Sequence, residues 1–487
     1  MITFSVYSLM NIRLSIIVCL LALIGFTACH DEDSFSSSPN HLLTFSSDSI
    51  KLDTVFSNIP SAAKSFWVYN HSGEGIRCSN VRLERGNQTG FRVNVDGIYL
   101  GKDVGYATSE IEIRKNDSIR VYVELTSPAK HADVPQRIED NIVFALENGK
   151  EQKVNLNAYA WDAVFLRNHH VMNDTVLAGT KPIVVFGKLT VEENKTLRIA
   201  AGTTLYFDQH AGIDVYGRLS IEGEPQKEVV LRGNRLDRMF DYLPYDGLSG
   251  QWQGVHIYSS SNENKITYTD IQGAYNGLVI DSADIAKQKL LMANSTIHNC
   301  QGYGLLIGHA QVSINNSVFS NTLNDCVSID GGDVVMNGCT LAQFYPFDSN
   351  RGVALRLSAA SSPLIQFVCN NSLVTGYSAH EVMRNPGKNA SLLHFAFENC
   401  LLRMPREESA DSVCFKNVLY EDVKDTIQAG HKNFLLIDTD SLRYDFRLRE
   451  KSLAIGKANQ STSLPLDRDG RKRDELPDIG AYEYFKP

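Results

Sequence analysis

Three aspartates and two arginines in the second half of the chain are of the types that act on acidic substrates. Asp325, Asp330 and Asp333 fall within nine residues, and Arg351 and Arg356 follow. Paired carboxyl groups can protonate a glycosidic oxygen and activate a water. A carboxylate cluster that holds a cation beside a basic residue can instead support removal of a proton α to a carboxylate. No pattern places the five side chains on one face, and an Asp-Gly-Gly-Asp sequence is equally typical of a tight turn.

The segment around Asp325 resembles a known catalytic motif. Asn324-Asp325-Cys326 is similar to the Asp-Asp-Cys segment of polygalacturonases, which implies a general acid and a water-activating carboxylate. Asn324 replaces the first aspartate, however, and the expected Gly-His-Gly does not follow. Pectate-lyase-like enzymes hold calcium with acidic ligands, so calcium is expected only if the chain is a lyase. No C-x-x-C motif occurs, and neither a metal centre nor another cofactor is otherwise predicted.

Three arginines and four aromatic residues occur together between residues 232 and 252, where the repeat is interrupted. Such side chains stack on sugars and form hydrogen bonds with them. The alternative is a loop that folds back over the protein and buries Trp252 and Phe240. The residues that we expect to bind a ligand are Arg235, Arg238, Tyr242, Tyr245 and Trp252.

A repeat must position these residues. An asparagine followed by a small residue and an aliphatic pair recurs at steps of 22, 21, 34 and 28 residues, at Asn294, Asn316, Asn337, Asn371 and Asn399. Steps of about 20 to 25 residues without helical periodicity are typical of the coils of a parallel β-helix, and the longer steps would hold insertions. One coil cannot bury its apolar face alone, so the coils must stack. Asn and Cys at matching points are then expected to form ladders inside the turns.

Several segments of the repeat region resemble right-handed parallel β-helix surface proteins of the pectin-lyase-like type. Residues 187–207, 217–223 and 250–255 are similar to the opening of such proteins, and residues 465–484 to their closing segment. The resemblance covers about residues 180 to 487. It implies the fold and leaves the activity almost undefined.

The region before the repeats has apolar residues alternating in short segments, such as 50–56, 91–95 and 119–125. This pattern predicts an immunoglobulin-like β-sandwich. The fold class predicted is therefore all-β, a sandwich followed by a right-handed parallel β-helix solenoid. The expected divisions are a signal peptide at 1–28, a tether at 29–40, the sandwich at 41–160, a linker at 161–182, the β-helix at 183–462 and a closing segment at 463–487.

The N-terminus predicts where the protein resides. An apolar run over 14–26 follows Arg13 and ends in Thr27-Ala28-Cys29, which resembles the lipobox of bacterial lipoproteins. Lipidation of Cys29, for instance with palmitate, would anchor the chain to the outer membrane. The acidic and then Ser-rich residues after Cys29 resemble the surface-export signal of Bacteroidota-type lipoproteins, which implies that the chain faces the cell exterior. A plain signal peptide cut near Ala28 is the alternative, and translation could begin at Met1 or Met10.

The triplet of Asp, Ser or Thr, and an aliphatic residue occurs eight times. It resembles the O-glycosylation site of exported Bacteroidota proteins. The same triplet also begins many turns and strands without any sugar. The candidate glycosylated residues are Ser49, Thr54, Ser118, Thr175, Ser282, Ser412, Thr426 and Ser441.

Composition limits the partners. The 487 residues include 43% hydrophobic residues, which excludes a disordered chain, and the net charge of -9 argues against a nucleic-acid partner. The sequence therefore predicts a cell-surface lipoprotein, not an enzyme, whose β-helix is a platform that binds glycan or another surface protein. The alternatives are a polysaccharide lyase or glycoside hydrolase acting on acidic glycan, and a structural subunit of an outer-membrane complex.

Overall fold

The computed structural model describes residues 34–406 and 411–486, apart from the side chains of Asp411 and Ser412. The signal segment and Cys29 lie outside the described residues. The chain divides into two compact units, one with the residues up to Pro128 and Arg137–Tyr159, the other with Ala129–Gln136 and Ala160–Pro487. No helix among the described residues has the length and apolar character needed to span a membrane.

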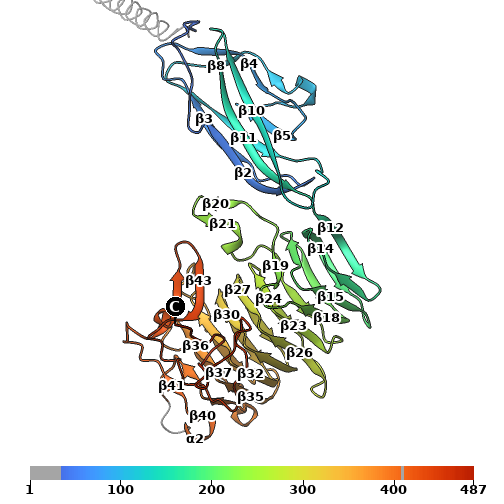
Figure 1. Cartoon of the computed structure of the whole chain (residues 1–487), viewed down its shortest axis with the longest axis vertical. Coiled ribbons are helices and arrows are strands. Elements are labelled where there is room, and N and C mark those ends of the chain that lie inside the picture. The colour runs from blue at the N-terminus through green and yellow to red at the C-terminus, as the bar shows by residue number, and fades with distance from the viewer. Residues whose placement is uncertain (1–33, 407–410, 487) are drawn as a thin grey trace, which may run out of the picture. The chain divides into compact units, whose positions relative to one another are not determined.

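The first unit consists of two sheets (Figure 1). One sheet has the order β1 (Thr44–Phe45), β3 (Lys64–Tyr69), β9 (Ser118–Leu125), β5 (Phe91–Val95) and β6 (Ile98–Tyr99). The other has β2 (Ser49–Phe56), β11 (Glu151–Trp161), β10 (Gln136–Leu146), β4 (Ile76–Leu83) and β7 (Ala107–Thr108), with β8 (Ile111–Ile113) beside β4 and the short helix η1 (Lys102–Val104) nearby in sequence. The two sheets meet where the rings of Phe45 and Phe144 lie 5.3 Å apart. An immunoglobulin-like topology for this unit stays a prediction.

The second unit is a parallel β-helix, as predicted. Its larger sheet contains β12 (Val164–Val171), β14 (Ile183–Val191), β16 (Thr204–Phe207), β17 (Gly212–Val215), β19 (Val229–Gly233), β22 (Val255–Ile257), β24 (Thr269–Gln272), β25 (Leu278–Ile280), β27 (Thr296–Cys300), β28 (Leu305–Ile307), β30 (Val318–Thr322), β31 (Val327–Asp330), β33 (Thr340–Gln343), β34 (Leu355–Ser358), β36 (Leu373–Gly376), β37 (Val382–Asn385), β39 (Leu401–Leu402) and β41 (Leu419–Tyr420).

The second sheet of the β-helix completes each coil. It contains β13 (Thr175–Leu177), β15 (Thr196–Ala200), β18 (Arg218–Glu222), β23 (Asn264–Thr267), β26 (Gln288–Ala293), β29 (Gln311–Asn315), β32 (Gly332–Asn337), β35 (Leu364–Asn370), β38 (Ala396–Glu398) and β40 (Phe415–Lys416). Short helical turns interrupt the coils at η3 (Ala390–Leu392), α2 (Asp411–Cys414) and η4 (Gly430–Asn433). A coil such as β26–β27–β28 thus gives one strand to each of three parallel ladders.

Apolar side chains stack inside the β-helix because successive coils repeat the same inward positions. Ile271, Ile297, Phe319, Leu341 and Val374 are register partners along the ladder β24–β27–β30–β33–β36, and all are buried in one core. The outer face of this ladder, with β16 and β19 before it and β39 after it, is called the flank below.

The turns before the flank strands explain the repeated asparagines. Asn294, Asn316 and Asn371 adopt left-handed φ angles of 51°, 43° and 48°, a conformation that asparagine tolerates better than most residues. In the coil between Asn316 and Asn371 this position belongs to Gly338, with φ 62°, so the expected alignment of Asn337 with the others is one residue out. The residue that follows each of these positions is Ser or Cys and is buried; Ser317 Oγ, for example, accepts a hydrogen bond from Ser295 N at 3.3 Å.

The segment predicted as a linker, 161–182, is part of the β-helix. β12 pairs in parallel with β14, and β13 pairs with β15. These residues therefore form the first coil. The run from Arg167 to His170 in β12 is exposed and lacks the alternation that would have indicated a strand.

The chain end covers the second half of the flank. A hairpin of β42 (Phe434–Asp438) and β43 (Arg443–Leu448) lies against it (Figure 1), and residues of the closing segment pack beside the hairpin. Val318, Ala342 and Leu373 point outward from the flank and are buried against Phe446 and Ile479. The closing segment is thus a cover for the side of the β-helix.

Candidate functional site

Asp325 is a structural residue in this fold. It precedes β31 and is 3% exposed. Its carboxylate accepts two hydrogen bonds from Arg356 and one from the backbone N of Val353. The acceptor sites that a catalytic carboxylate would offer to substrate or water are used to hold the next coil.

Asp330 and Asp333 do not join Asp325. Asp330 is the last residue of β31, at the other end of the strand from Asp325, and accepts hydrogen bonds from Ser358 Oγ at 2.8 Å and from the N atoms of Ala360 and Ser361. Burial by itself would raise the pKa of Asp330, but these donors outweigh it and lower that pKa. Asp333 lies in β32, which belongs to the other sheet. The catalytic cluster that the sequence suggested is therefore not formed.

Arg351 likewise does not join these aspartates. The Arg351 guanidinium lies over the Tyr377 ring, 4.6 Å from its centroid, and donates to the carbonyl oxygen of Asp348. Within the described ranges, no three His, Cys, Asp or Glu side chains gather in a way that could hold a metal ion.

The loop between β19 and β22 forms an ordered insertion. It contains the hairpin of β20 (Arg238–Phe240) and β21 (Leu243–Pro244) and the turn η2 (Tyr245–Gly247). Arg235 donates two hydrogen bonds to Asp237, at 2.7 and 2.5 Å, and stacks on the Tyr245 ring at 3.9 Å. Arg238 donates to the carbonyl oxygen of Asp241. The predicted ligand-binding arginines and Tyr245 are thus engaged in holding the insertion together.

Two aromatic rings stand exposed at the tip of the insertion. Phe240 and Tyr242 are 52% and 63% exposed, and their rings are nearly parallel, at 11° and 5.7 Å between centroids. Apolar aromatic surface that is exposed to water is unfavourable, and a partner that covers it gains that free energy on binding. Of the five predicted ligand contacts, Tyr242 is the one whose ring is presented to solvent in this way, and Phe240 joins it.

Trp252 is not a ligand contact. Its side chain is 0% exposed, stacks on Phe207 at 4.2 Å and 11°, and donates from Nε1 to the carbonyl oxygen of Gln272 at 2.8 Å. The alternative prediction was that the loop folds back and buries both Trp252 and Phe240. It is correct for Trp252 and wrong for Phe240.

A histidine–aspartate pair on the flank escaped the sequence analysis. His298 of β27 and Asp270 of β24 point outward from neighbouring coils, with His298 Nε2 3.0 Å from Asp270 Oδ1. Burial alone would lower the pKa of His298, but the Asp270 carboxylate outweighs it and keeps that pKa above its ordinary value. Burial would raise the pKa of Asp270, and the His298 imidazolium in turn keeps it low.

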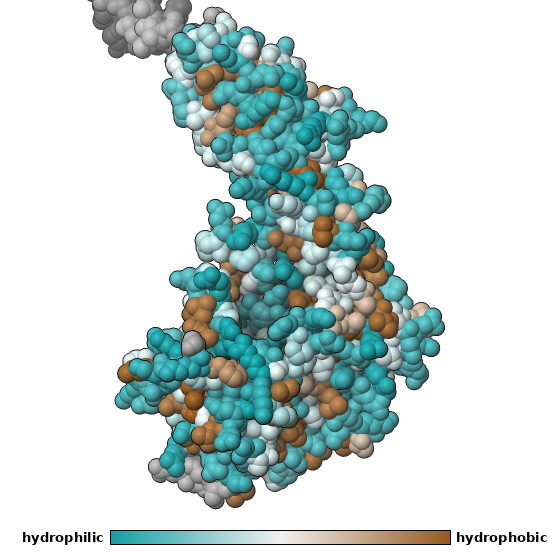
Figure 2. Space-filling model, viewed as in Figure 1, coloured by the Kyte–Doolittle hydropathy of each residue, from teal (hydrophilic) through white to brown (hydrophobic). Residues whose placement is uncertain are grey.

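A cavity of about 230 Å³ opens beside this pair. Its floor is the flank at Thr296, His298 and Ser320, and its far wall is the hairpin at Leu442 and Tyr444. The insertion closes one side: Asn299 Nδ2 donates to the carbonyl oxygen of Gly247 at 3.1 Å. Figure 2 shows the surface hollowed between the insertion and the hairpin.

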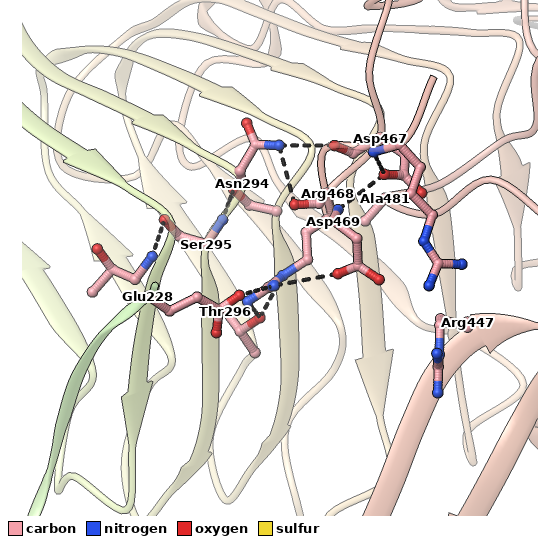
Figure 3. Close-up of polar contacts among 12 residues, drawn as sticks. Glu228, Asn294, Ser295, Thr296, Arg447, Asp467, Arg468, Asp469 and Ala481 are labelled. Atoms are coloured by element: carbon pink, nitrogen blue, oxygen red, sulfur yellow. Dashed lines mark hydrogen bonds and ion pairs between the residues drawn. The ribbon is translucent and has the colours of Figure 1, made fainter. Parts of the chain in front are cut away.

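The closing segment holds this region together from outside (Figure 3). Asn294 Nδ2 donates to the carbonyl oxygens of Asp467 and Arg468, at 2.9 and 3.2 Å. The Arg468 guanidinium turns back to Glu228 and donates to Thr296 Oγ1 at 2.9 Å. Asn316, Asn337 and Asn371 bond to residues 459–466 in the same manner. The repeated asparagines therefore act as a row of attachment points for the chain end.

Comparison with known proteins gives little further information. The chain matches no protein-family model, and no curated protein sequence matches it significantly. It is similar to Dex49A from Penicillium minioluteum, at 8% identity over 75% of this chain and 74% of that chain with a TM-score of 0.24, and to a Family 28 exopolygalacturonase of Yersinia enterocolitica, at 10% identity over 69% and 72% with a TM-score of 0.15. A family 123 glycoside hydrolase from Clostridium perfringens matches at 9% identity over 26% of this chain and 29% of that chain, with a TM-score of 0.18. The strand pairing defines an all-β protein with a parallel β-helix. This β-helix has an insertion with two aromatic rings at its tip and a flank that the hairpin and the closing segment cover.

Proposed function

We propose that the chain is a cell-surface lipoprotein that binds glycan on the flank of its β-helix without cleaving it. The observation that carries this proposal is the exposed, nearly parallel pair Phe240 and Tyr242 at the tip of the insertion. Aromatic faces of this kind stack on the C–H faces of sugar rings, while polar groups nearby receive the hydroxyls.

Polar groups lie on the flank, which the base of the insertion contacts. His298, Asp270 and the hydroxyl-bearing residues of the cavity lie on the flank, and Arg232 joins the flank to the insertion through Asp246 at 3.1 Å. The engagement of Asp325 by Arg356 disfavours the alternative of a polysaccharide lyase or hydrolase built on the predicted aspartates.

Anchoring through Cys29 and O-glycosylation are parts of the same proposal. Seven of the eight candidate glycosylation sites have described side chains; Ser282 and Thr426 are exposed, and the other five are partly exposed. Mass spectrometry of the protein from its native membrane tests both modifications.

Electrophoresis in gels that contain single polysaccharides, neutral or acidic, tests glycan binding by the full chain in detergent. We expect retardation in at least one gel and its loss in the double variant Phe240→Ala/Tyr242→Ala, with about a tenfold weaker affinity for each ring removed. The matched control is Tyr159→Ala, a change at a 47% exposed ring in β11. Unchanged retardation of the double variant, or none for the wild type, would refute the proposal. Release of unsaturated products or new reducing ends would refute its non-catalytic part.

A further inference from the structure

Two residues that line the cavity between the flank and the hairpin have buried hydroxyl groups that form no hydrogen bond within the described part of the chain. Ser320 is 0% exposed, and its Oγ has no hydrogen-bond partner among the described residues. Tyr444 OH is buried and equally without a partner there. Both residues line the cavity. Buried polar groups in proteins are almost always hydrogen-bonded, because an unmade bond costs free energy. Two unsatisfied hydroxyl groups on residues that line one cavity point to a ligand that would supply the missing hydrogen bonds.

The shape and polarity of the walls restrict the ligand. At about 230 Å³ the cavity lies below the range of roughly 300–1,000 Å³ that is typical of drug-sized ligands. Val318, Leu442 and Phe446 give it apolar walls, and the two hydroxyls give it polar points. A ligand that consists of a single ring, with an apolar face and hydroxyl groups at its edge, matches these walls.

The charges around the cavity cancel. His298 is paired with Asp270, and Asp445 accepts hydrogen bonds from Arg447 Nε at 2.9 and 3.1 Å. Burial raises the pKa of Tyr444, so its hydroxyl stays protonated and can donate. A ligand with a net charge would gain no unpaired counter-charge here, whereas a neutral polyol would satisfy the free hydroxyls.

We propose that this cavity binds a single neutral sugar ring, with Ser320 Oγ and Tyr444 OH as its hydrogen-bonding contacts. The inference rests on the proposed glycan binding and deepens it, because it separates a ring-sized subsite from the open aromatic surface at the insertion tip.

The test uses saturation-transfer NMR with the full chain and free glucose, galactose, mannose, fucose and N-acetylglucosamine as probes. We expect transfer to at least one sugar, and about a tenfold loss of affinity in each of Ser320→Ala and Tyr444→Phe. The melting temperature of both variants should stay equal or rise, because each change removes an unsatisfied buried group. This combination of lost binding and kept stability is not expected of residues that only support the fold.

The controls separate this inference from the proposed function. Phe240→Ala/Tyr242→Ala should lose retardation by polysaccharide and keep the signal of the free sugar. Absence of transfer to every probe, or equal transfer in wild type and both cavity variants, would overturn the inference, even where polysaccharide retardation persists. A free-sugar signal without polysaccharide retardation would support the cavity and count against the aromatic surface.

Discussion

The guanidinium of Arg356 donates two hydrogen bonds to the carboxylate of Asp325, from Nε to Oδ2 at 2.6 Å and from Nη2 to Oδ1 at 3.0 Å. The carboxylate is buried, whereas 38% of the arginine side chain is exposed. The pair joins the start of β31 to β34 on the next coil.

Arg356→Ala should therefore destabilise the protein without affecting glycan binding. Removing the arginine leaves a buried carboxylate without its counter-charge, a change that costs about 3–5 kcal/mol. Urea unfolding followed by circular dichroism measures the loss. Arg351→Ala, which removes a cation stacked on Tyr377, is the control and should cost less than about 1 kcal/mol. Equal losses for the two variants would contradict the role assigned to the pair.

Replacement of Trp252 should likewise lower stability and spare binding. Trp252→Ala creates a cavity beside Phe207 and should cost about 3–5 kcal/mol. Trp252→Phe keeps much of the ring volume and leaves the carbonyl oxygen of Gln272 unbonded, at a cost of about 1–3 kcal/mol. Polysaccharide gels run well below the melting temperature should show wild-type retardation. Lost retardation in a stably folded Trp252→Phe protein would mean that the ring does contact glycan.

Glu381 should make stability fall as the pH rises toward neutrality. The residue is 0% exposed, and burial raises its pKa to about 7 in spite of hydrogen bonds from the N atoms of Ser378 and Ala354. Between the ordinary pKa of 4.5 and about 7, the folded state holds a proton that the unfolded state has released. Stability therefore decreases with pH across this window, by up to about 3 kcal/mol, and is constant above it.

Glu381→Gln tests this dependence because glutamine does not titrate. The stability of the variant relative to wild type should improve steadily from pH 4.5 to pH 7 and then level off, as measured by urea unfolding at a series of pH values. Parallel pH profiles for the two proteins would disprove the raised pKa.

Asn371 combines a backbone role with an attachment role that two substitutions separate. Its φ is 48°, its Oδ1 accepts from Asn459 N at 2.8 Å, and its Nδ2 donates to Thr462 Oγ1 at 3.0 Å. Asn371→Gly keeps the left-handed turn and loses the attachment, at about 1–3 kcal/mol. Asn371→Ala loses both and should cost about 1 kcal/mol more. Melting temperatures rank the variants, and a glycine variant less stable than the alanine variant would contradict the left-handed conformation.

The stacked coils could be predicted from sequence because their signal is local and repeated. A core position such as Ile297 has counterparts at the same point of each coil, and the asparagine turns mark the interval. The prediction of a linker at 161–182 was wrong because β12 is largely exposed, and such a strand shows no apolar alternation in the sequence. The alignment through Asn337 was wrong by one residue because Gly338 supplies the left-handed turn there.

The site could not be predicted because it depends on register between coils. His298 and Asp270 are 28 residues apart and meet diagonally across two strands, a relation that a one-residue shift would abolish. The attachment of Asn294 to Asp467 joins residues 173 positions apart. Neither relation leaves a pattern in the chain, whereas the exposed Tyr242 was accessible to prediction through its residue type and its place in an interrupted repeat.

The attachment of residues 459–468 to coils that precede them by some 90 to 170 positions has a consequence for the order of events during synthesis. The coils can stack as they emerge, since each needs only its neighbour. The outer side of the coils stays exposed to water at first. Phe446 and Ile479, which cover it, follow these coils in the sequence and are therefore synthesised later. Tyr444 and Tyr482 also wall the cavity beside His298, so that cavity does not exist in a nascent chain. A nascent chain that has not yet been extended through Tyr482, or a form cleaved before the hairpin, would have a β-helix without this cavity.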